Sequence, residues 1–238
     1  MLFAASLTSC DNFLDTESFD KKNTGNFPVT VADAQSMLTG IYNSLNAAIS
    51  NVQNTHFYMA ELASDDRFGG GGENDRDMQG LDHLMNTQPD RFLTFWTARY
   101  QGIFRANTAL ETLNQVTGWT SENEYNQTLG EVHFLRALYY FELSQMFGEV
   151  PLVTSSTVSN VPKASSEETY AVIAQDLKTA IEIMPNTPYN TVVSGHATKW
   201  AAQALIARVF LFYTGYYNKS ELPLSDGGSI TKAQVIQW

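Results

Sequence analysis

The stretch that decides the fold is Phe134-Leu135-Arg136-Ala137-Leu138-Tyr139, and its counterpart is Ile206-Ala207-Arg208-Val209-Phe210-Leu211, 72 residues further along the chain. The two stretches match in chemical character, because each carries one arginine at the same place among apolar residues. Tetratricopeptide units are about 34 residues long, so this spacing is close to two units. Each such unit is a pair of helices, and neighbouring pairs bury a continuous core between them. The repeat therefore predicts a right-handed stack of helix pairs.

Apolar stripes at helical spacing, together with capping residues, predict five helices around these stretches. They are residues 30–49 capped by Thr30, residues 96–113, residues 121–147 ending at Gly148, residues 165–184 ending at Pro185, and residues 197–213 ending at Gly215. The third helix is apolar on all sides in its second half, so we expect neighbours on several sides. Residues 150–154 are the one short candidate strand, and residues 229–238 resemble the start of a further helix.

Most of the aromatic and polar residues on these helices have a structural interpretation. Trp96, Tyr100 and Trp200 lie at core spacing, so we expect them to pack inside the stack. Asn107 interrupts an apolar stripe, and a polar residue in that position is usually buried and bonded to backbone groups.

The two arginines at equivalent repeat positions, Arg136 and Arg208, have long apolar stems and charged ends. Such side chains bury the stem and bring the guanidinium to a carboxylate. We therefore expect both to form ion pairs between helices, with Glu131 and Glu142 as candidate partners.

The composition excludes several classes of function. The chain has 14 basic and 25 acidic residues among 238, for a net charge of −11. A nucleic-acid-binding protein needs clustered Lys and Arg, and docking on anionic lipid needs the same excess of positive charge. A single cysteine excludes an intrachain disulfide and a cysteine-based metal site. No apolar run is long enough to span a membrane.

The one cysteine, Cys10, follows a short apolar run that ends in small residues, which is typical of the end of a secretion signal. The sequence Leu7-Thr8-Ser9-Cys10 resembles the bacterial lipobox, whose cysteine is lipidated. Acyl chains on this cysteine would anchor the protein to a membrane. We predict residues 1–10 as the end of a lipoprotein signal, residues 11–29 as a tether and lead-in, and residues 30–238 as one helical domain.

Four stretches, in the same order along the chain, resemble segments of the SusD/RagB family. They are Cys10–Asp15, Phe95–Asn107, Gly130–Leu152 and Ala197–Val209. The third is close to the most recognisable segment of the family. In the fourth, many relatives have a small residue in place of Trp200. The matches span nearly the whole chain, which makes a chance similarity improbable.

The resemblance implies a mainly α-helical, tetratricopeptide-like fold with a loop-rich insertion before Trp96. It also implies a lipoprotein on the outer face of the outer membrane, which captures glycans or similar nutrients. SusD-like proteins pass oligosaccharides to a TonB-dependent SusC-like transporter, and they have no catalytic activity and no cofactor. Members of the family are roughly twice as long, so we expect the carboxy-terminal half of the family fold to be missing from this chain.

The segment from Glu61 to His83 is the candidate glycan site. Its polar and aromatic side chains lie around the run Gly69–Gly72, and loops at the rim of a rigid scaffold are the usual place for binding residues. The candidate residues are Asp65, Asp66, Arg67, Phe68, Asn74, Arg76 and Asp77. In the starch-binding relatives, part of the ligand site comes from the corresponding region. The competing interpretation is a solvated, flexible loop.

Three other functions compete with glycan capture. A glycosidase needs two rigidly placed carboxylates, and Asp66 and Asp75 are examples of candidates in the same loop. The loop could bind calcium, although the EF-hand spacing is absent, and no two histidines are spaced as a zinc pair. A plain tetratricopeptide scaffold that binds a protein would have the same core. The resemblance therefore favours a glycan-binding lipoprotein without catalytic activity, no metal ligands are assigned, and calcium binding by the loop stays open.

Overall fold

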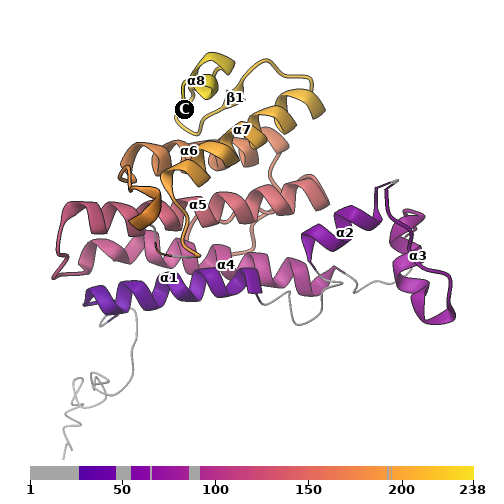
Figure 1. Cartoon of the computed structure of the whole chain (residues 1–238), viewed down its shortest axis with the longest axis horizontal. Coiled ribbons are helices and arrows are strands. Elements are labelled where there is room, and N and C mark those ends of the chain that lie inside the picture. The colour runs from indigo at the N-terminus through magenta and orange to yellow at the C-terminus, as the bar shows by residue number, and fades with distance from the viewer. Residues whose placement is uncertain (1–26, 47–54, 65, 86–91, 192, 194) are drawn as a thin grey trace, which may run out of the picture.

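The computed structural model describes residues 27–46, 55–64, 66–85, 92–191, 193 and 195–238 (Figure 1). Cys10 and most of the predicted tether lie outside these residues, as does Ile49. The helices are α1 Val31–Asn46, α2 His56–Leu62, α3 Arg76–Asp82, α4 Leu93–Thr112, α5 Glu122–Phe147, α6 Ser166–Ile183, α7 Lys199–Tyr216 and α8 Lys232–Gln237. Two short antiparallel strands, β1 Leu222–Pro223 and β2 Ser229–Ile230, pair between α7 and α8.

The boundaries of the long helices follow from their capping residues. The Ser121 hydroxyl accepts a hydrogen bond from the Glu124 amide at 3.2 Å, which satisfies one free amide at the start of α5. Ser165 and Glu168 form a reciprocal capping box at the start of α6. Gly148 ends α5 with a φ of 71°, a conformation that favours glycine. The predicted starts of these two helices, and the predicted end of α5, are confirmed.

The five long helices form one row in the order α1, α4, α5, α6, α7, in which each contacts the next (Figure 1). Helix α5 is central, between α4 and α6. The consecutive helices α4, α5, α6 and α7 are neighbours in space, as expected for stacked helix pairs. The predicted mainly helical fold is confirmed. None of the described helices is long and apolar enough to cross a membrane.

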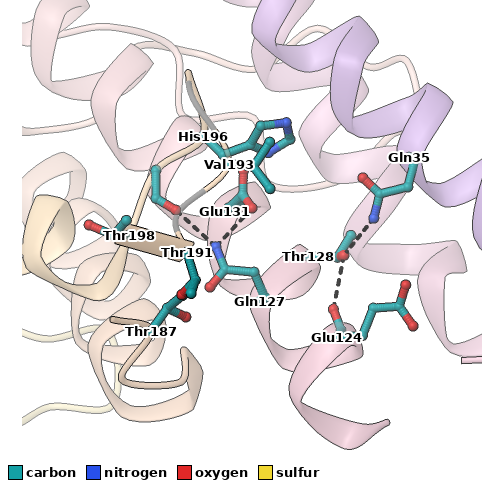
Figure 2. Close-up of a pocket in the computed structure, with 11 residues that line it drawn as sticks. Gln35, Glu124, Gln127, Thr128, Glu131, Thr187, Thr191, Val193, His196 and Thr198 are labelled. Carbon is teal, nitrogen blue, oxygen red and sulfur yellow. Dashed lines mark hydrogen bonds and ion pairs between the residues drawn. The ribbon is translucent and has the colours of Figure 1, made fainter. Parts of the chain in front are cut away.

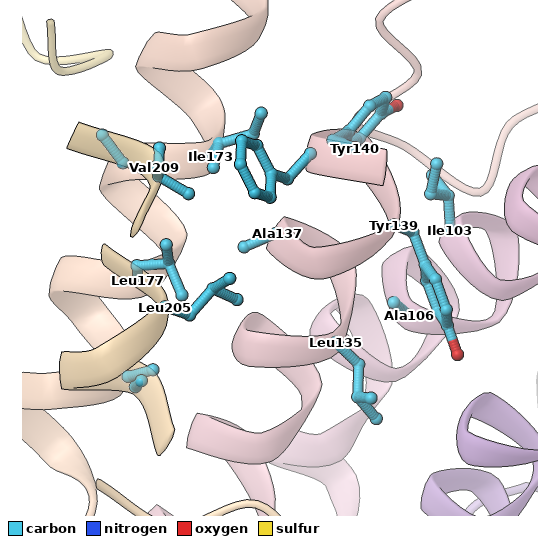
Figure 3. Close-up of a cluster of buried hydrophobic side chains, with 14 of the residues drawn as sticks. Ile103, Ala106, Leu135, Ala137, Tyr139, Tyr140, Ile173, Leu177, Leu205 and Val209 are labelled. Carbon is cyan, nitrogen blue, oxygen red and sulfur yellow. The ribbon is translucent and has the colours of Figure 1, made fainter. Parts of the chain in front are cut away.

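Helix α5 forms the centre of the hydrophobic core (Figure 3). Its residues Leu135, Ala137, Tyr139 and Tyr140 are all fully buried, although they lie on different sides of the helix. Tyr139 faces α4 and donates a hydrogen bond to the carbonyl of Ile41 on α1 at 2.6 Å. This burial on all sides confirms the arrangement expected from the apolar second half of the predicted helix.

A buried polar network joins α4, α5 and α6. Arg136 donates from Nε to Asp176 Oδ2 and from Nη2 to Asp176 Oδ1, both at 2.7 Å. Its Nη1 donates to Asn107 Oδ1 at 2.8 Å. The Asn107 side-chain amide in turn donates to the carbonyls of Val153 and Ser155. Asn107 is therefore buried and bonded to backbone groups, as predicted.

The predicted partners of the two arginines are wrong. Arg136 pairs with Asp176, whereas Glu142 pairs with Arg99 and Glu131 lies beside His196. Arg208 is exposed, and no ion pair joins it to a carboxylate within the described ranges. The reason is that Arg208 lies on an exposed face of α7, the last of the five long helices in the row.

Three predictions about the elements are also wrong. Trp200 is 42% exposed, because it lies on the same outer face of α7 as Arg208. Gly215 does not end α7, which continues to Tyr216. Residues 150–154 form no strand, and Pro151 makes only an isolated bridge with Lys163. This segment instead bonds to Asn107 and to Tyr140 through the carbonyl of Val153.

Candidate functional site

The segment before α4 contains two short helices, α2 and α3, that lie beyond the tips of the long helices, at the right of the view (Figure 1). Thr55 caps α2 by accepting a hydrogen bond from the Tyr58 amide at 3.2 Å. Neither helix was predicted, because seven residues are too few to show an apolar stripe. Helices this short are stable only where they pack on the rest of the protein.

The glycine run between α2 and α3 packs closely on α3. A Cβ atom at Gly69 would lie 2.6 Å from the carbonyl oxygen of Met78, so no larger residue fits there. The Gly69 amide donates to Asp82 Oδ2 at 2.9 Å, and the Gln79 side chain donates to the carbonyls of Gly70 and Gly72. The backbone of the glycine run is thus fixed by α3.

A cavity of about 330 Å³ lies between α2 and this loop. Its lining residues are Phe57, Tyr58, Glu61, Leu62, Arg67, Phe68 and Met78. Phe57 is 69% exposed and Phe68 is 76% exposed, so two aromatic rings stand at one cavity in contact with water. Arg67 Nε donates to Glu61 Oε2 at 2.7 Å, and this pair places a cation and a carboxylate at the same cavity.

The structure brings two of the predicted site residues to this cavity, Arg67 and Phe68. Asp66, Asn74 and Arg76 are exposed and do not line it. Asp65 lies outside the described residues, and so does the side chain of Asp77 on α3.

Sequence reasoning missed the contribution of α2 to this cavity. Phe57 and Tyr58 precede the predicted segment, and they line the cavity because α2 turns them toward the loop. The aromatic run at residues 56–58 was the one available signal, and its place at the cavity could not be inferred without a helix prediction. The described residues contain no group of three or more His, Cys, Asp or Glu side chains that could hold a metal ion.

Comparisons with known proteins agree with one another. Residues 12–211 match the SusD-like family described as "Starch-binding associating with outer membrane". One SusD-like protein of Formosa agariphila is 26% identical over 190 residues, which is 76% of this chain and 36% of that protein. Another from the same organism is 27% identical over 217 residues, which is 88% of this chain and 40% of that protein.

The fold of the chain is also similar to that of solved SusD-like structures. A "Laminarin binding SusD-like protein" is 29% identical, with a TM-score of 0.67, over 80% of this chain and 42% of that one. "Surface glycan-binding protein A" from Bacteroides fluxus is 28% identical, with a TM-score of 0.65, over the same shares. The chain therefore spans less than half the length of these relatives.

Proposed function

Because the chain belongs to the SusD-like family of starch-binding proteins that associate with the outer membrane, we propose that it captures glycans for uptake and performs no catalysis. The observation that carries this proposal is the pair of exposed rings, Phe57 and Phe68, at the cavity between α2 and the glycine run. In this proposal the cavity forms part of the glycan site.

The chemistry of this cavity suits a sugar ring. A pyranose has apolar faces of C–H groups and a rim of hydroxyls, so it needs flat apolar surfaces beside polar groups. Phe57 and Phe68 supply the apolar surfaces, and covering exposed rings contributes roughly 25 cal/mol per Å² of apolar area. The Arg67–Glu61 pair supplies N–H donors and carboxylate acceptors for the hydroxyls.

The rigidity of the loop also favours binding. The hydrogen bonds from Gly69 and Gln79 fix the glycine run on α3 before any ligand arrives. A site that is already ordered loses less conformational entropy when it binds. This observation favours a binding loop over the alternative of a solvated, flexible loop.

Electrophoresis of the purified chain through native gels that contain dissolved polysaccharide tests the function. Laminarin and starch are the first two to include, since a relative binds laminarin and the family is described as starch-binding. We expect one class of glycan to retard the chain relative to a non-binding protein. If no polysaccharide retards it, the proposal fails, and a tetratricopeptide-type scaffold for a protein partner becomes the better account.

We propose in addition that the protein is anchored on the cell surface through Cys10 and partners a TonB-dependent SusC-like transporter. The lipobox sequence supports the anchor, and family membership supports the transporter. Labelling cells with radioactive palmitate should mark the wild type and not the Cys10→Ala variant. Equal labelling of the two would contradict the anchor. Recovery of a TonB-dependent transporter with the wild type from solubilised outer membranes tests the partnership, and its absence would contradict it.

A further inference from the structure

A second cavity, of about 320 Å³, is lined by segments at the tips of the long helices opposite to those beside α2 and α3 (Figure 2). Its walls come from α1, the first half of α5 and the segment that leads into α7. The lining residues used below are Gln35, Glu124, Gln127, Thr128, Thr187 and Val193. The glycan site proposed above shares none of these residues.

A buried carboxylate holds the wall of this cavity together. The Glu131 side chain is 3% exposed, and its Oε2 accepts a hydrogen bond from the Tyr42 hydroxyl at 2.5 Å and lies 2.8 Å from His196 Nδ1. The Tyr42 hydroxyl accepts one from the Ala197 amide at 2.7 Å. These contacts tie α1, α5 and the segment before α7 to one another, so the cavity has fixed walls.

The hydrogen bonds of Gln127 determine which atom of its side-chain amide is available to bind a ligand. Its Nε2 lies 2.8 Å from Glu131 Oε1 and 2.8 Å from the carbonyl of Ala197, and both of these atoms are acceptors (Figure 2). The NH₂ group must therefore face them. The Gln127 side-chain oxygen remains, and within the described residues it has no hydrogen-bond donor.

The same reasoning applies to Gln35 on the other side of the cavity. The Thr128 hydroxyl donates its proton to the carbonyl of Glu124 at 3.0 Å, so it can only accept from Gln35. Gln35 Nε2 donates to it at 3.1 Å. The Gln35 side-chain oxygen is thus also without a donor among the residues that the structure describes.

The cavity therefore presents two amide oxygens that accept no hydrogen bond from the described residues, and the acidic residue Glu124 also lines it. A ligand that fits must carry several O–H groups and no negative charge. Val193 and the methyl groups of the threonines add apolar surface of the kind that a sugar ring covers. The volume, close to that of the first cavity, is at the lower end of the range for small-molecule sites and accommodates about one sugar ring. We propose that this cavity is a second binding site, for a single neutral monosaccharide unit.

Titration of the purified chain with D-glucose, D-galactose and N-acetyl-D-glucosamine, followed by protein NMR shifts, tests the proposal. We expect saturable shifts at residues of α1 and α5 around the cavity with at least one of these sugars. D-glucuronate, which carries a carboxylate, should bind at least tenfold more weakly. The absence of saturable shifts with all three neutral sugars would overturn the proposal, and so would equal binding of glucuronate.

Two variants and a control test whether the sugar binds in this cavity. Gln35→Leu removes one open oxygen and should weaken binding about fivefold, the loss expected for one neutral hydrogen bond. Thr187→Phe fills the cavity and should abolish binding, and it keeps the proposal testable if Gln35→Leu folds poorly. Gln203→Leu changes a half-buried glutamine on α7 away from the cavity and should leave affinity unchanged.

The same titrations distinguish sugar binding in this cavity from sugar binding in the cavity at α2 and the glycine run. Unchanged affinity in both Gln35→Leu and Thr187→Phe would overturn the proposal. Loss of monosaccharide binding in a Phe57→Ala, Phe68→Ala double variant would also overturn it, because binding would then belong to the first cavity. Loss of polysaccharide binding alone in that double variant would leave the second site intact.

Discussion

Among single residues, Asp176 connects two central helices through a buried carboxylate. It lies on α6, and its carboxylate binds Arg136 and His133 of α5, while Arg136 reaches Asn107 of α4. The Asp176 side chain is 3% exposed and that of Arg136 is 12% exposed. A charge pair buried this deeply contributes to stability mainly because the loss of one partner leaves the other charge without compensation.

Replacing Asp176 with Asn should therefore lower the free energy of unfolding by about 3 kcal/mol, because Arg136 keeps its charge in a buried place. Urea denaturation followed by circular dichroism measures the change. Lys178→Gln is the matched control, since it removes a more exposed ion pair with Glu182 on the same helix and should cost less than about 0.5 kcal/mol. Equal losses in the two variants would contradict the role given to Asp176.

Acid should remove the same interaction. Burial alone would raise the pKa of Asp176, but Arg136 and His133 lower it by more, so its pKa in the folded protein lies below the ordinary 3.8. The unfolded chain therefore takes up this proton at a higher pH than the folded chain does. The contribution of Asp176 to stability is complete above about pH 5 and is lost as the pH falls below about 4.

Urea denaturation of the wild type and Asp176→Asn between pH 6 and pH 3 measures this effect. The wild type should lose more stability over that range than the variant, because the variant has no carboxylate to protonate. Parallel pH profiles would contradict the lowered pKa.

Sequence reasoning at this scale predicted which residues are polar and buried, but not their partners. Asn107 and Arg136 were identified because a polar residue on an apolar stripe needs compensation. Asp176 was not selected, since its partner depends on how α5 and α6 are rotated against each other. The exposure of Arg208 and Trp200 could not be predicted either, because it depends on which face of α7 is covered.

Among the elements, α4 and α5 pack tightly against each other at a glycine, Gly102. A Cβ atom at Gly102 of α4 would overlap the ring of Tyr139 on α5. That ring is fully buried and its hydroxyl is bonded to the Ile41 carbonyl, so it cannot move aside easily. The absence of a side chain at Gly102 thus leaves room for the Tyr139 ring between the two helices.

Gly102→Ala should consequently lower the free energy of unfolding by about 1–3 kcal/mol, the usual cost of overpacking. Gly40→Ala on α1 is the control, because a Cβ atom there meets nothing within 4 Å. It should be neutral or raise stability by up to about 1 kcal/mol through helix propensity. Thermal unfolding of both variants decides between these outcomes, and a loss in Gly40→Ala as large as in Gly102→Ala would contradict the packing argument.

The long helices could be predicted and the short ones could not, for a physical reason. Helices α5 and α6 carry their own capping residues and enough turns to show an apolar face. Helices α2 and α3 have seven residues each and depend on packing with the rest of the chain. For this reason the part of the candidate site that α2 supplies, Phe57 and Tyr58, could not be predicted from the sequence.

At the scale of the whole molecule, the long helices form a scaffold. The residues at their two opposite sets of tips differ in chemistry. The α2–α3 side presents exposed aromatic rings with an ion pair, and the opposite side presents a cavity of similar volume with open amide oxygens. The repeat and the capping signals predicted the scaffold, and the family resemblance predicted the segment of the first cavity. The second cavity depends on three segments that are distant in the sequence, so no local pattern indicated it.

The measurement that tests the central claim most directly is isothermal titration of the retarding glycan, as an oligosaccharide, into the wild type and the Phe57→Ala, Phe68→Ala double variant. Tyr216→Ala is the control, because Tyr216 is 73% exposed but lies on α7. The account predicts that the double variant loses at least about tenfold in affinity, or ~1.4 kcal/mol, while the control keeps the wild-type value. Wild-type affinity in the double variant would contradict the assignment of glycan capture to the cavity at α2 and the glycine run.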